Sequence, residues 1–215
     1  MAISNDKAAF FIIDMQNGFV QPESELCIAG AEATLPQCAR ALARARELAI
    51  PVYYIRREYA EDGSNVEAVR YESWLKSGRL LSRASTDSGS IDFPKKIRPE
   101  PEDIVVTKPR FSAFLNTGLD EELRARSVNT VILTGTTTPN CIRATCFDAL
   151  SLGYNVVIIE DCTSSRTPEV QAANIADMAF IGAQIISTDT FCASGLEETR
   201  DIELELQEAL SRAAR

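Results

Sequence analysis

Short, strongly apolar runs alternate with longer segments of helical periodicity along most of this chain. Six runs rich in β-branched and aromatic residues are candidate strands, apolar enough to be covered on both faces. They span residues 8–13, 51–56, 103–107, 130–134, 155–160 and 184–187. Apolar residues recur at helical spacing over residues 31–49, 118–127, 139–152, 168–182 and 197–213, the last as a closing amphipathic helix. This alternation is typical of βαβ units and predicts an α/β fold with a central, mostly parallel six-stranded sheet.

Length and charge restrict the class of partner. The chain has 215 residues, a formal net charge of -9 and 45% hydrophobic residues, which predicts one domain over residues 1–215 with a single sizeable core. An acidic surface disfavours nucleic acid and anionic lipid, because both require concentrated positive charge. The first apolar run reads as a strand and not as a signal peptide, and no run approaches the length of a membrane span. We therefore expect a small-molecule partner, no nucleic acid and no membrane.

The six cysteines are scattered without a CxxC pair. Together with the lack of a secretory signal, this pattern favours reduced thiols in a cytoplasmic protein. Most of the cysteines are expected to be small buried packing residues, and their spacing gives no support to a metal site. Neither a GxGxxG nor a GxxxxGK[ST] motif occurs, so we expect no nucleotide, no metal and no cofactor.

The absence of histidine excludes the common ways of activating a nucleophile. A Ser-His-Asp triad, a Cys-His pair and a histidine-ligated zinc site are all impossible in this chain. Asp14, Lys108 and Cys141 each follow an apolar run, at or beyond the predicted carboxyl end of a strand. Open α/β sheets place their sites at that edge, so we predict that the three side chains converge. Taken singly, Asp14 is equally explained as a turn residue, Lys108 as a surface residue and Cys141 as a core cysteine.

The surroundings of Cys141 predict an activated thiol. Thr138 is a candidate N-cap and Pro139 a first helical residue, which places Cys141 in the first turn of a helix. The helix N-terminus and the Lys108 ammonium are expected to lower the pKa of the thiol. The Asp14 carboxylate acts in the opposite direction, and we predict that it accepts the thiol proton.

Residues 57–102 interrupt the βα alternation with glycine, serine and charge clusters around the single Trp74. Long excursions of this kind in compact α/β proteins are commonly lids, binding loops or oligomer contacts. A solvated surface loop with a short helix near Trp74 is an equally good explanation.

Three segments, FFIIDMQNGF, VVTKPRFSAF and VILTGTTTPNCIRATCFDALSLGYNVVIIEDC, occur in this order between about Ala8 and Phe191. In this respect the chain resembles the isochorismatase-like cysteine hydrolase superfamily, which includes nicotinamidases, N-carbamoylsarcosine amidase and ureidoacrylate amidohydrolase. The resemblance implies a three-layer α/β/α fold and a catalytic triad of Asp14, Lys108 and Cys141. It also implies a cis peptide at Thr136–Thr137, with the Thr137 and Cys141 amides forming an oxyanion hole.

The implied reaction is attack of the Cys141 thiolate on the carbonyl of a small amide or ureide, loss of ammonia or an amine, and hydrolysis of the thioester. Phe19, Trp74 and Phe114 are candidate walls of an apolar substrate pocket, and Gln16 is expected to orient the site. Either Arg110 or Arg143 is a candidate ligand for a substrate carboxylate. A solvated or structural role is as good an explanation for both arginines.

Two departures from the superfamily narrow the expected activity. Nicotinamidases resemble one another in a histidine-containing metal site, which a chain without histidine cannot build, so nicotinamide is disfavoured. Isochorismatases generally lack the nucleophilic cysteine, so Cys141 favours cleavage of a carbon–nitrogen bond. An enol-ether hydrolase and a non-catalytic binding protein remain the alternatives. The resemblance further implies a homo-oligomer, a dimer or a tetramer, with an interface near Trp74.

Overall fold

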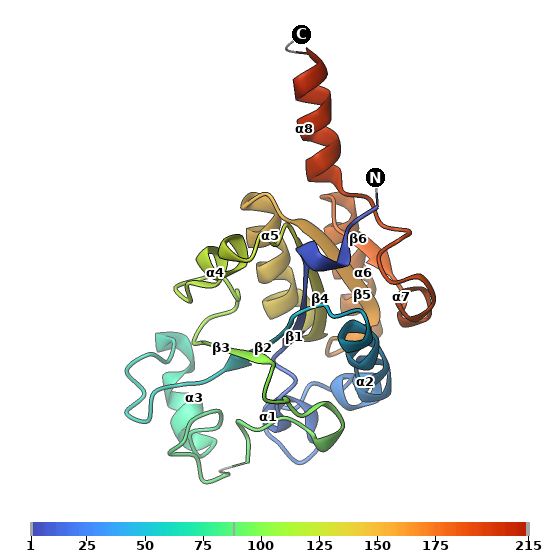
Figure 1. The fold of residues 1–215 in the computed structure, drawn as a ribbon. Coiled ribbons are helices and arrows are strands. Elements are labelled where there is room, and N and C mark those ends of the chain that lie inside the picture. The colour runs from blue at the N-terminus through green and yellow to red at the C-terminus, as the bar shows by residue number, and fades with distance from the viewer. Residues whose placement is uncertain (1, 88, 214–215) are drawn as a thin grey trace.

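The computed structural model describes residues 2–87 and 89–213. Its strands form one sheet in the order β3-β2-β1-β4-β5-β6, and every neighbouring pair is parallel (Figure 1). The strands are β1 (Ala8–Ile13), β2 (Val52–Arg57), β3 (Ile104–Lys108), β4 (Thr130–Thr136), β5 (Asn155–Ser164) and β6 (Gln184–Ile186). The predicted parallel six-stranded sheet is therefore confirmed. The order reverses between β1 and β4, where crevices form outside the carboxyl ends of the strands.

Helices cover both faces of the sheet. The α-helices are α1 (Asn17–Val20), α2 (Ala31–Glu47), α3 (Tyr71–Lys76), α4 (Leu119–Ala125), α5 (Arg143–Ser151), α6 (Pro168–Phe180), α7 (Thr188–Ser194) and α8 (Ile202–Ala213). Short 3₁₀ turns span Asn5–Lys7, Ala68–Arg70 and Lys95–Ile97, and a π-helical turn spans Thr138–Ile142. The α2 and α7 helices pack on one face, and α4, α5 and α6 pack on the other. This arrangement confirms three α/β/α layers.

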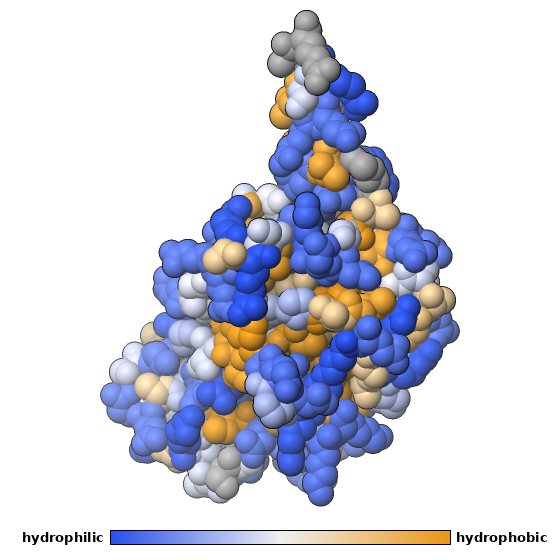
Figure 2. All heavy atoms as spheres, in the orientation of Figure 1, coloured by the Kyte–Doolittle hydropathy of each residue, from blue (hydrophilic) through white to orange (hydrophobic). Residues whose placement is uncertain are grey.

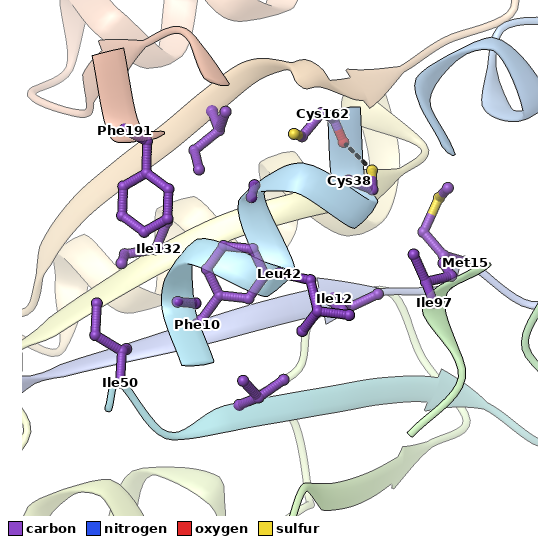
Figure 3. Close-up of a cluster of buried hydrophobic side chains, with 14 of the residues drawn as sticks. Phe10, Ile12, Met15, Cys38, Leu42, Ile50, Ile97, Ile132, Cys162 and Phe191 are labelled. Carbon is purple, nitrogen blue, oxygen red and sulfur yellow. Dashed lines mark hydrogen bonds between the residues drawn. The ribbon is translucent and has the colours of Figure 1, made fainter. Parts of the chain in front are cut away.

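The alternation of side chains along β1 explains why this strand is buried on both faces. Phe10 and Ile12 point into the core beneath α2, where Phe10 stacks on Phe191 with 6.0 Å between ring centroids (Figure 3). Phe11 and Ile13 belong to the core on the opposite face. Each such fully buried side chain stabilises the fold by roughly 1.5–3 kcal/mol. A strand in this position must be apolar at every residue, as residues 8–13 are.

The cysteines behave largely as the sequence predicts. All six are free thiols, and four of them are buried. The Cys38 thiol donates to the Cys162 carbonyl over 3.4 Å beneath α2 (Figure 3). Cys146 also lies in a hydrophobic core, on the other face of the sheet.

The C-terminal segment differs from the prediction. The helix expected over residues 197–213 begins only at Ile202, and a separate helix, α7, precedes it. The α8 helix is amphipathic but buries none of its residues, and it projects from the body of the protein (Figure 1). The Asp201 carboxylate accepts hydrogen bonds from the Asn129 and Asn155 side chains and from the Leu204 amide, which ties the start of α8 to the amino ends of β4 and β5. The chain is thereby directed away from the sheet, so α8 does not close the core.

The irregular segment 57–102 is neither structureless nor fully solvated. It contains α3 and two 3₁₀ turns, and Trp74 packs with Tyr59, Val66 and Leu81 in a small core of its own. The indole nitrogen of Trp74 donates to the Leu80 carbonyl over 2.9 Å. This segment folds beside the carboxyl ends of β2 and β3, next to the predicted site.

Hydrophobic residues on the surface gather between α2 and α4, where the β3 edge of the sheet faces the viewer (Figure 2). Val105 of this edge strand is 44% exposed. Among the described residues, no helix has both the length and the apolar character needed to cross a membrane.

Candidate active site

Four neighbouring strands end at the site. Asp14 directly follows β1, Lys108 is the last residue of β3, and Cys141 lies in the π-helical turn after β4. The register pairs Ile13 with Gly135 on one side and with Ile55 on the other, so these strand ends are level. The carboxyl edge therefore carries all three predicted catalytic side chains to one place.

The Lys108 ammonium joins the other two groups. Its Nζ donates to Asp14 Oδ2 over 2.8 Å, to Cys141 Sγ over 3.5 Å and to the Arg110 carbonyl over 3.0 Å. An ammonium has three protons, and these three acceptors account for all of them. Lys108 and Asp14 are 0% and 1% exposed, so their ion pair is almost fully removed from water. The convergence predicted from the sequence is observed.

The thiol differs from the prediction in its protonation. Burial is the largest cause that raises the pKa of Cys141 to about 12, and the Asp14 charge raises it further. The Lys108 and Arg57 cations act in the opposite direction but do not overcome these two causes. The expectation of a lowered thiol pKa is therefore wrong, because Cys141 is only 4% exposed and shares its single neighbouring ammonium with a carboxylate. Near neutral pH, Cys141 is a thiol and must lose its proton to react.

Asp14 has an oxygen free to receive that proton. Its Oδ1 is buried and accepts no hydrogen bond from the part of the chain that the structure describes, whereas Oδ2 accepts from Lys108. The backbone of Asp14 is left-handed, with φ of 52°, which a short polar side chain tolerates better than a bulky one. The left-handed turn follows the end of β1, and the Asp14 carboxylate contacts Lys108.

Gly135 allows β1 and β4 to approach closely. It has φ of 111°, and a Cβ at this position would lie 2.1 Å from the Ile13 carbonyl oxygen. A side chain is therefore excluded by both conformation and space. The close contact brings the loop that carries Cys141 against the end of β1, where Asp14 lies.

The loop after β4 is held by one carbonyl. The hydroxyls of Thr136, Thr137 and Thr138 donate to the Ser164 carbonyl at the end of β5, over 3.5, 3.4 and 2.9 Å. The expected cis peptide at Thr136–Thr137 is present. The predicted capping role of Thr138 is wrong, because its hydroxyl is bonded to Ser164 and the residue itself begins the π-helical turn.

A buried cluster beside the triad was not predicted. Arg57 ends β2, is paired in register with Lys108, and is only 2% exposed. Its guanidinium forms an ion pair with Glu67 and donates to the Tyr59 hydroxyl over 3.0 Å and the Pro109 carbonyl over 3.2 Å. Although burial alone would raise it, the pKa of Glu67 is held below its usual range by Arg57 and Tyr59. The predicted strand stopped at residue 56, one residue short, so a buried arginine at a strand end was not recognised.

Phe19 and Trp74 line one cavity, as the sequence analysis expected. The cavity has a volume of about 180 Å³ and is shared with Arg57, Tyr59 and Arg70. The positive charge of Arg57 also acts to lower the pKa of the Cys141 thiol, so Arg57 both lines the cavity and influences the predicted nucleophile.

Phe114, the third aromatic residue predicted to line the substrate pocket, lies elsewhere. The Phe114 ring stacks on Tyr154 with 5.7 Å between centroids and tilts against Phe11, inside the core beneath α4. The expectation that Phe114 lines a pocket together with Phe19 and Trp74 is therefore wrong. The preceding residue explains the difference, because the Ala113 amide donates to the Thr145 hydroxyl over 3.0 Å and holds the segment against α5.

Gln16 is buried with all of its polar groups used. Its amide nitrogen donates to the Arg57 and Ile91 carbonyls over 2.9 and 3.1 Å, and its oxygen accepts from the Arg57 amide over 2.7 Å. Gln16 thus joins β1, β2 and the irregular segment. It positions Arg57 and leaves no group for a substrate.

Arg110 and Arg143 also have other partners. Arg110 donates to the Asn65 and Pro109 carbonyls. Arg143 donates to Asn174 over 2.9 Å and forms an ion pair with Asp177 at 2.5 Å on the surface. Among residues 2–87 and 89–213, no three acidic or cysteine side chains gather closely enough to hold a metal ion.

Comparison with known proteins shows which family this chain is similar to. The sequence model of the isochorismatase domain matches residues 8–190. A probable inactive nicotinamidase of Arabidopsis thaliana is 35% identical over 82% of this chain and 90% of that protein, and the ureidoacrylate amidohydrolase RutB of Azorhizobium caulinodans is 30% identical over 81% and 84%. The crystal structure of an isochorismatase family protein from Desulfovibrio vulgaris superposes with a TM-score of 0.81, at 38% identity, over 86% of this chain and 96% of that one.

Proposed function

Because the chain belongs to the isochorismatase family of hydrolases, we propose that it is a metal-independent cysteine amidohydrolase that cleaves a carbon–nitrogen bond of a small amide or ureide. The observation that carries the proposal is one buried ammonium, Lys108 Nζ, in contact with both the Asp14 carboxylate and the Cys141 sulfur. A carboxylate and a cation replace the histidine that this chain lacks.

The first half of the reaction forms a thioester. The Cys141 proton passes to an Asp14 carboxylate oxygen while the sulfur bonds to the carbonyl carbon of the substrate. The backbone amides of Thr137 and Cys141 are proposed to stabilise the negative charge on the carbonyl oxygen. The carbon–nitrogen bond then breaks, and Asp14 gives its proton to the departing ammonia or amine.

The second half regenerates the thiol. Water attacks the thioester carbon while Asp14 accepts one of its protons. The carbon–sulfur bond breaks, the acid product leaves, and the proton returns from Asp14 to the sulfur. Throughout the cycle Lys108 offsets the single negative charge of the site, which lies on Asp14 before attack and in the thioester state, and on the substrate oxygen in the tetrahedral intermediates.

The raised pKa of the Cys141 thiol supports a step in which its proton is transferred while the sulfur attacks the carbonyl carbon. A thiolate formed before the substrate binds would be disfavoured by burial and by Asp14. Proton loss is favourable only when the sulfur is forming its new bond. The buried Asp14 Oδ1, which accepts no hydrogen bond in the described part of the chain, supports the choice of Asp14 as the acceptor of that proton.

The experiment is an ammonia-release screen over primary amides, carbamoyl compounds and ureides. Wild type is compared with Cys141→Ala and with Cys146→Ala, a matched control because Cys146 is also buried and lies about one and a half turns further along the same segment. We expect ammonia from wild type and Cys146→Ala but not from Cys141→Ala. A thioester trapped at low pH and located on Cys141 by mass spectrometry identifies the nucleophile.

Two alternatives give different results. An enol-ether hydrolase would release no nitrogen, and the presence of Cys141 at the site argues against it. A binding protein without turnover is favoured by the similarity to a plant protein named as probably inactive. For such a protein, binding of an amide would be unaffected by Asp14→Asn, and no covalent adduct would form.

The expected homo-oligomer is a further part of this proposal. Val69, Tyr71 and Leu75, beside Trp74, are 93%, 40% and 41% exposed and offer an apolar surface for a second copy. Light scattering of wild type and Val69→Glu tests it: we expect the variant to dissociate, and a monomeric wild type would contradict the proposal.

A further inference from the structure

Two cations line the cavity beside the triad, and one carboxylate among the described residues lies near them. Its walls are largely apolar, with Phe19, Leu26, Trp74 and Leu81 contributing. Two guanidinium groups also line it, those of Arg57 and Arg70. Among the residues that the structure describes, Glu67 is the carboxylate bound to Arg57, whereas the Arg70 side chain has no hydrogen-bonded or ion-paired partner. Glu67 also responds to the Arg70 charge, which helps to lower its pKa, so two guanidinium groups share one carboxylate and the group carries a net positive charge.

The Arg70 guanidinium stacks on an aromatic ring, and its hydrogen-bond donors are unused in the described part of the chain. It lies 5.1 Å from the centre of the Phe111 ring, and Arg57 lies 5.1 Å from the same ring. Stacking on an aromatic face leaves the planar edge of the guanidinium, with its donors, open. A half-buried arginine whose donors are unused is suited to bind a carboxylate through two parallel hydrogen bonds.

The cavity and the triad share one chain segment. Lys108, at the end of β3, donates to the Arg110 carbonyl, and the next residue is Phe111, on which Arg70 stacks. From the other strand, Arg57 lines the cavity and also acts on the Cys141 thiol. A small molecule with its amide at Cys141 and its far end in the cavity would therefore meet Arg70.

We propose that Arg70 binds a carboxylate of the substrate, so that the preferred substrates are small amides or ureides that also carry a carboxylate. This inference rests on the proposed function, because it concerns the far end of the molecule that Cys141 attacks. Arg70 thereby takes the role of carboxylate ligand for which Arg110 and Arg143 were the candidates in the sequence. Those two arginines use their donors on carbonyls or on Asp177, and the residues that line this cavity do not include them.

Binding measured without turnover tests the assignment. The Cys141→Ala protein is titrated calorimetrically with malonamate, succinamate and glutaramate, and with propionamide, butyramide and valeramide, which replace each carboxylate by a methyl group. The same titrations are made in the Arg70→Gln, Arg70→Lys and Arg143→Gln backgrounds. Inorganic phosphate serves as the non-carboxylate anion.

We expect at least one of the three acids to bind about tenfold or more tightly than its neutral counterpart, as is typical of a charge-assisted pair. Arg70→Gln should abolish this preference and leave the neutral amides unchanged, whereas Arg143→Gln should keep it. Arg70→Lys retains the charge but not the planar fork, so it should keep part of the preference. Melting temperatures identify any variant that fails to fold. If Arg70→Gln fails to fold, Arg70→Lys is compared with the parent protein in its place.

Three results would overturn the assignment: no acid binds better than its neutral counterpart, the preference survives Arg70→Gln, or phosphate binds more tightly than every carboxylate. The proposed function fails separately, when Cys141→Ala still releases ammonia. Release of ammonia that depends on Cys141, with a preference that survives Arg70→Gln, would leave the function intact and remove only the role of Arg70.

Discussion

Arg57 and Lys108 are paired in register at the ends of β2 and β3, so two buried cations lie side by side at the carboxyl edge of the sheet. Each is neutralised by a carboxylate from a different segment, Glu67 for Arg57 and Asp14 for Lys108. The two ion pairs place the triad and the neighbouring cavity in one continuous electrostatic site.

Replacing the lysine should destabilise the whole fold. Lys108→Met leaves the Asp14 charge buried without a partner, and we expect a loss of roughly 3–5 kcal/mol in the free energy of unfolding. Urea denaturation measures it. Arg40→Met, which breaks the exposed pair with Asp189, should cost less than about 1 kcal/mol. Equal losses in the two variants would contradict the importance given to burial.

Asp14→Asn should separate thiol acidity from activity. Removing the negative charge takes away a cause that raises the pKa of Cys141, so the pKa should fall below about 12 while Lys108 still favours the thiolate. Turnover should nevertheless fall by about 10²- to 10⁴-fold, because the proton acceptor is lost. Thiolate absorbance against pH, with the double variant Asp14→Asn/Cys141→Ala as blank, measures the pKa. An unchanged or higher pKa would refute the assigned interaction.

Gly135→Ala should disturb the site through the backbone. The added Cβ would meet the Ile13 carbonyl, and the positive φ is unfavourable for alanine, so we expect a loss of more than about 2 kcal/mol in stability. Gly118→Ala is the matched control, since Gly118 also has a positive φ but no atom within 4 Å of the added Cβ. Chemical denaturation should therefore give Gly135→Ala a much lower free energy of unfolding than Gly118→Ala.

Stability should decline at alkaline pH. Burial raises the pKa values of Tyr53, Tyr59, Cys141 and Cys146 to about 12, from ordinary values of 10.0 for tyrosine and 9.0 for cysteine. Above pH 9 the unfolded chain loses these protons first, so the free energy of unfolding falls as the pH rises from 9 to 12. Urea midpoints across this range should show it. In Tyr53→Phe the free energy of unfolding should fall less steeply with pH. The same slope in wild type and Tyr53→Phe would count against burial of the Tyr53 hydroxyl.

Shortening the chain should leave the fold intact. A protein ending at Glu205 keeps the hydrogen bonds of Asp201 but lacks most of α8, which buries none of its residues. We expect a melting temperature within about 2 °C of wild type. A drop beyond 5 °C would show that α8 supports the core.

Periodicity was sufficient to predict the sheet but not its exact limits. The strand over residues 8–13 was predicted with its observed limits, because a central strand is apolar throughout and is bounded by charged residues. The strand predicted over residues 51–56 ends one residue before β2 does, since two consecutive arginines after an apolar run read as the start of a loop. The buried partner that makes this arginine acceptable, Glu67, comes from the irregular segment, where no periodic pattern exists.

The convergence of Asp14, Lys108 and Cys141 could be predicted because the three residues lie at or just beyond the ends of strands, whose carboxyl ends must meet. The cavity was predicted only through Phe19 and Trp74, because Arg57 and Arg70 enter its lining from a segment whose path the sequence does not specify. Phe114 shows the same limit: three residues from Phe111, it points into the core instead of into the cavity. The acidity of Cys141 was wrongly predicted because neighbouring charges can be read from a sequence and depth of burial cannot.

The position of α8 has a practical consequence. It begins at the amino ends of β4 and β5, whereas Cys141 lies beyond the carboxyl end of β4. A tag, a fluorophore or a solid support attached through the carboxyl terminus would therefore sit on the side of the molecule opposite Asp14, Lys108 and Cys141. A protein immobilised in this orientation would present the edge of the sheet that carries these three residues to the bulk solution.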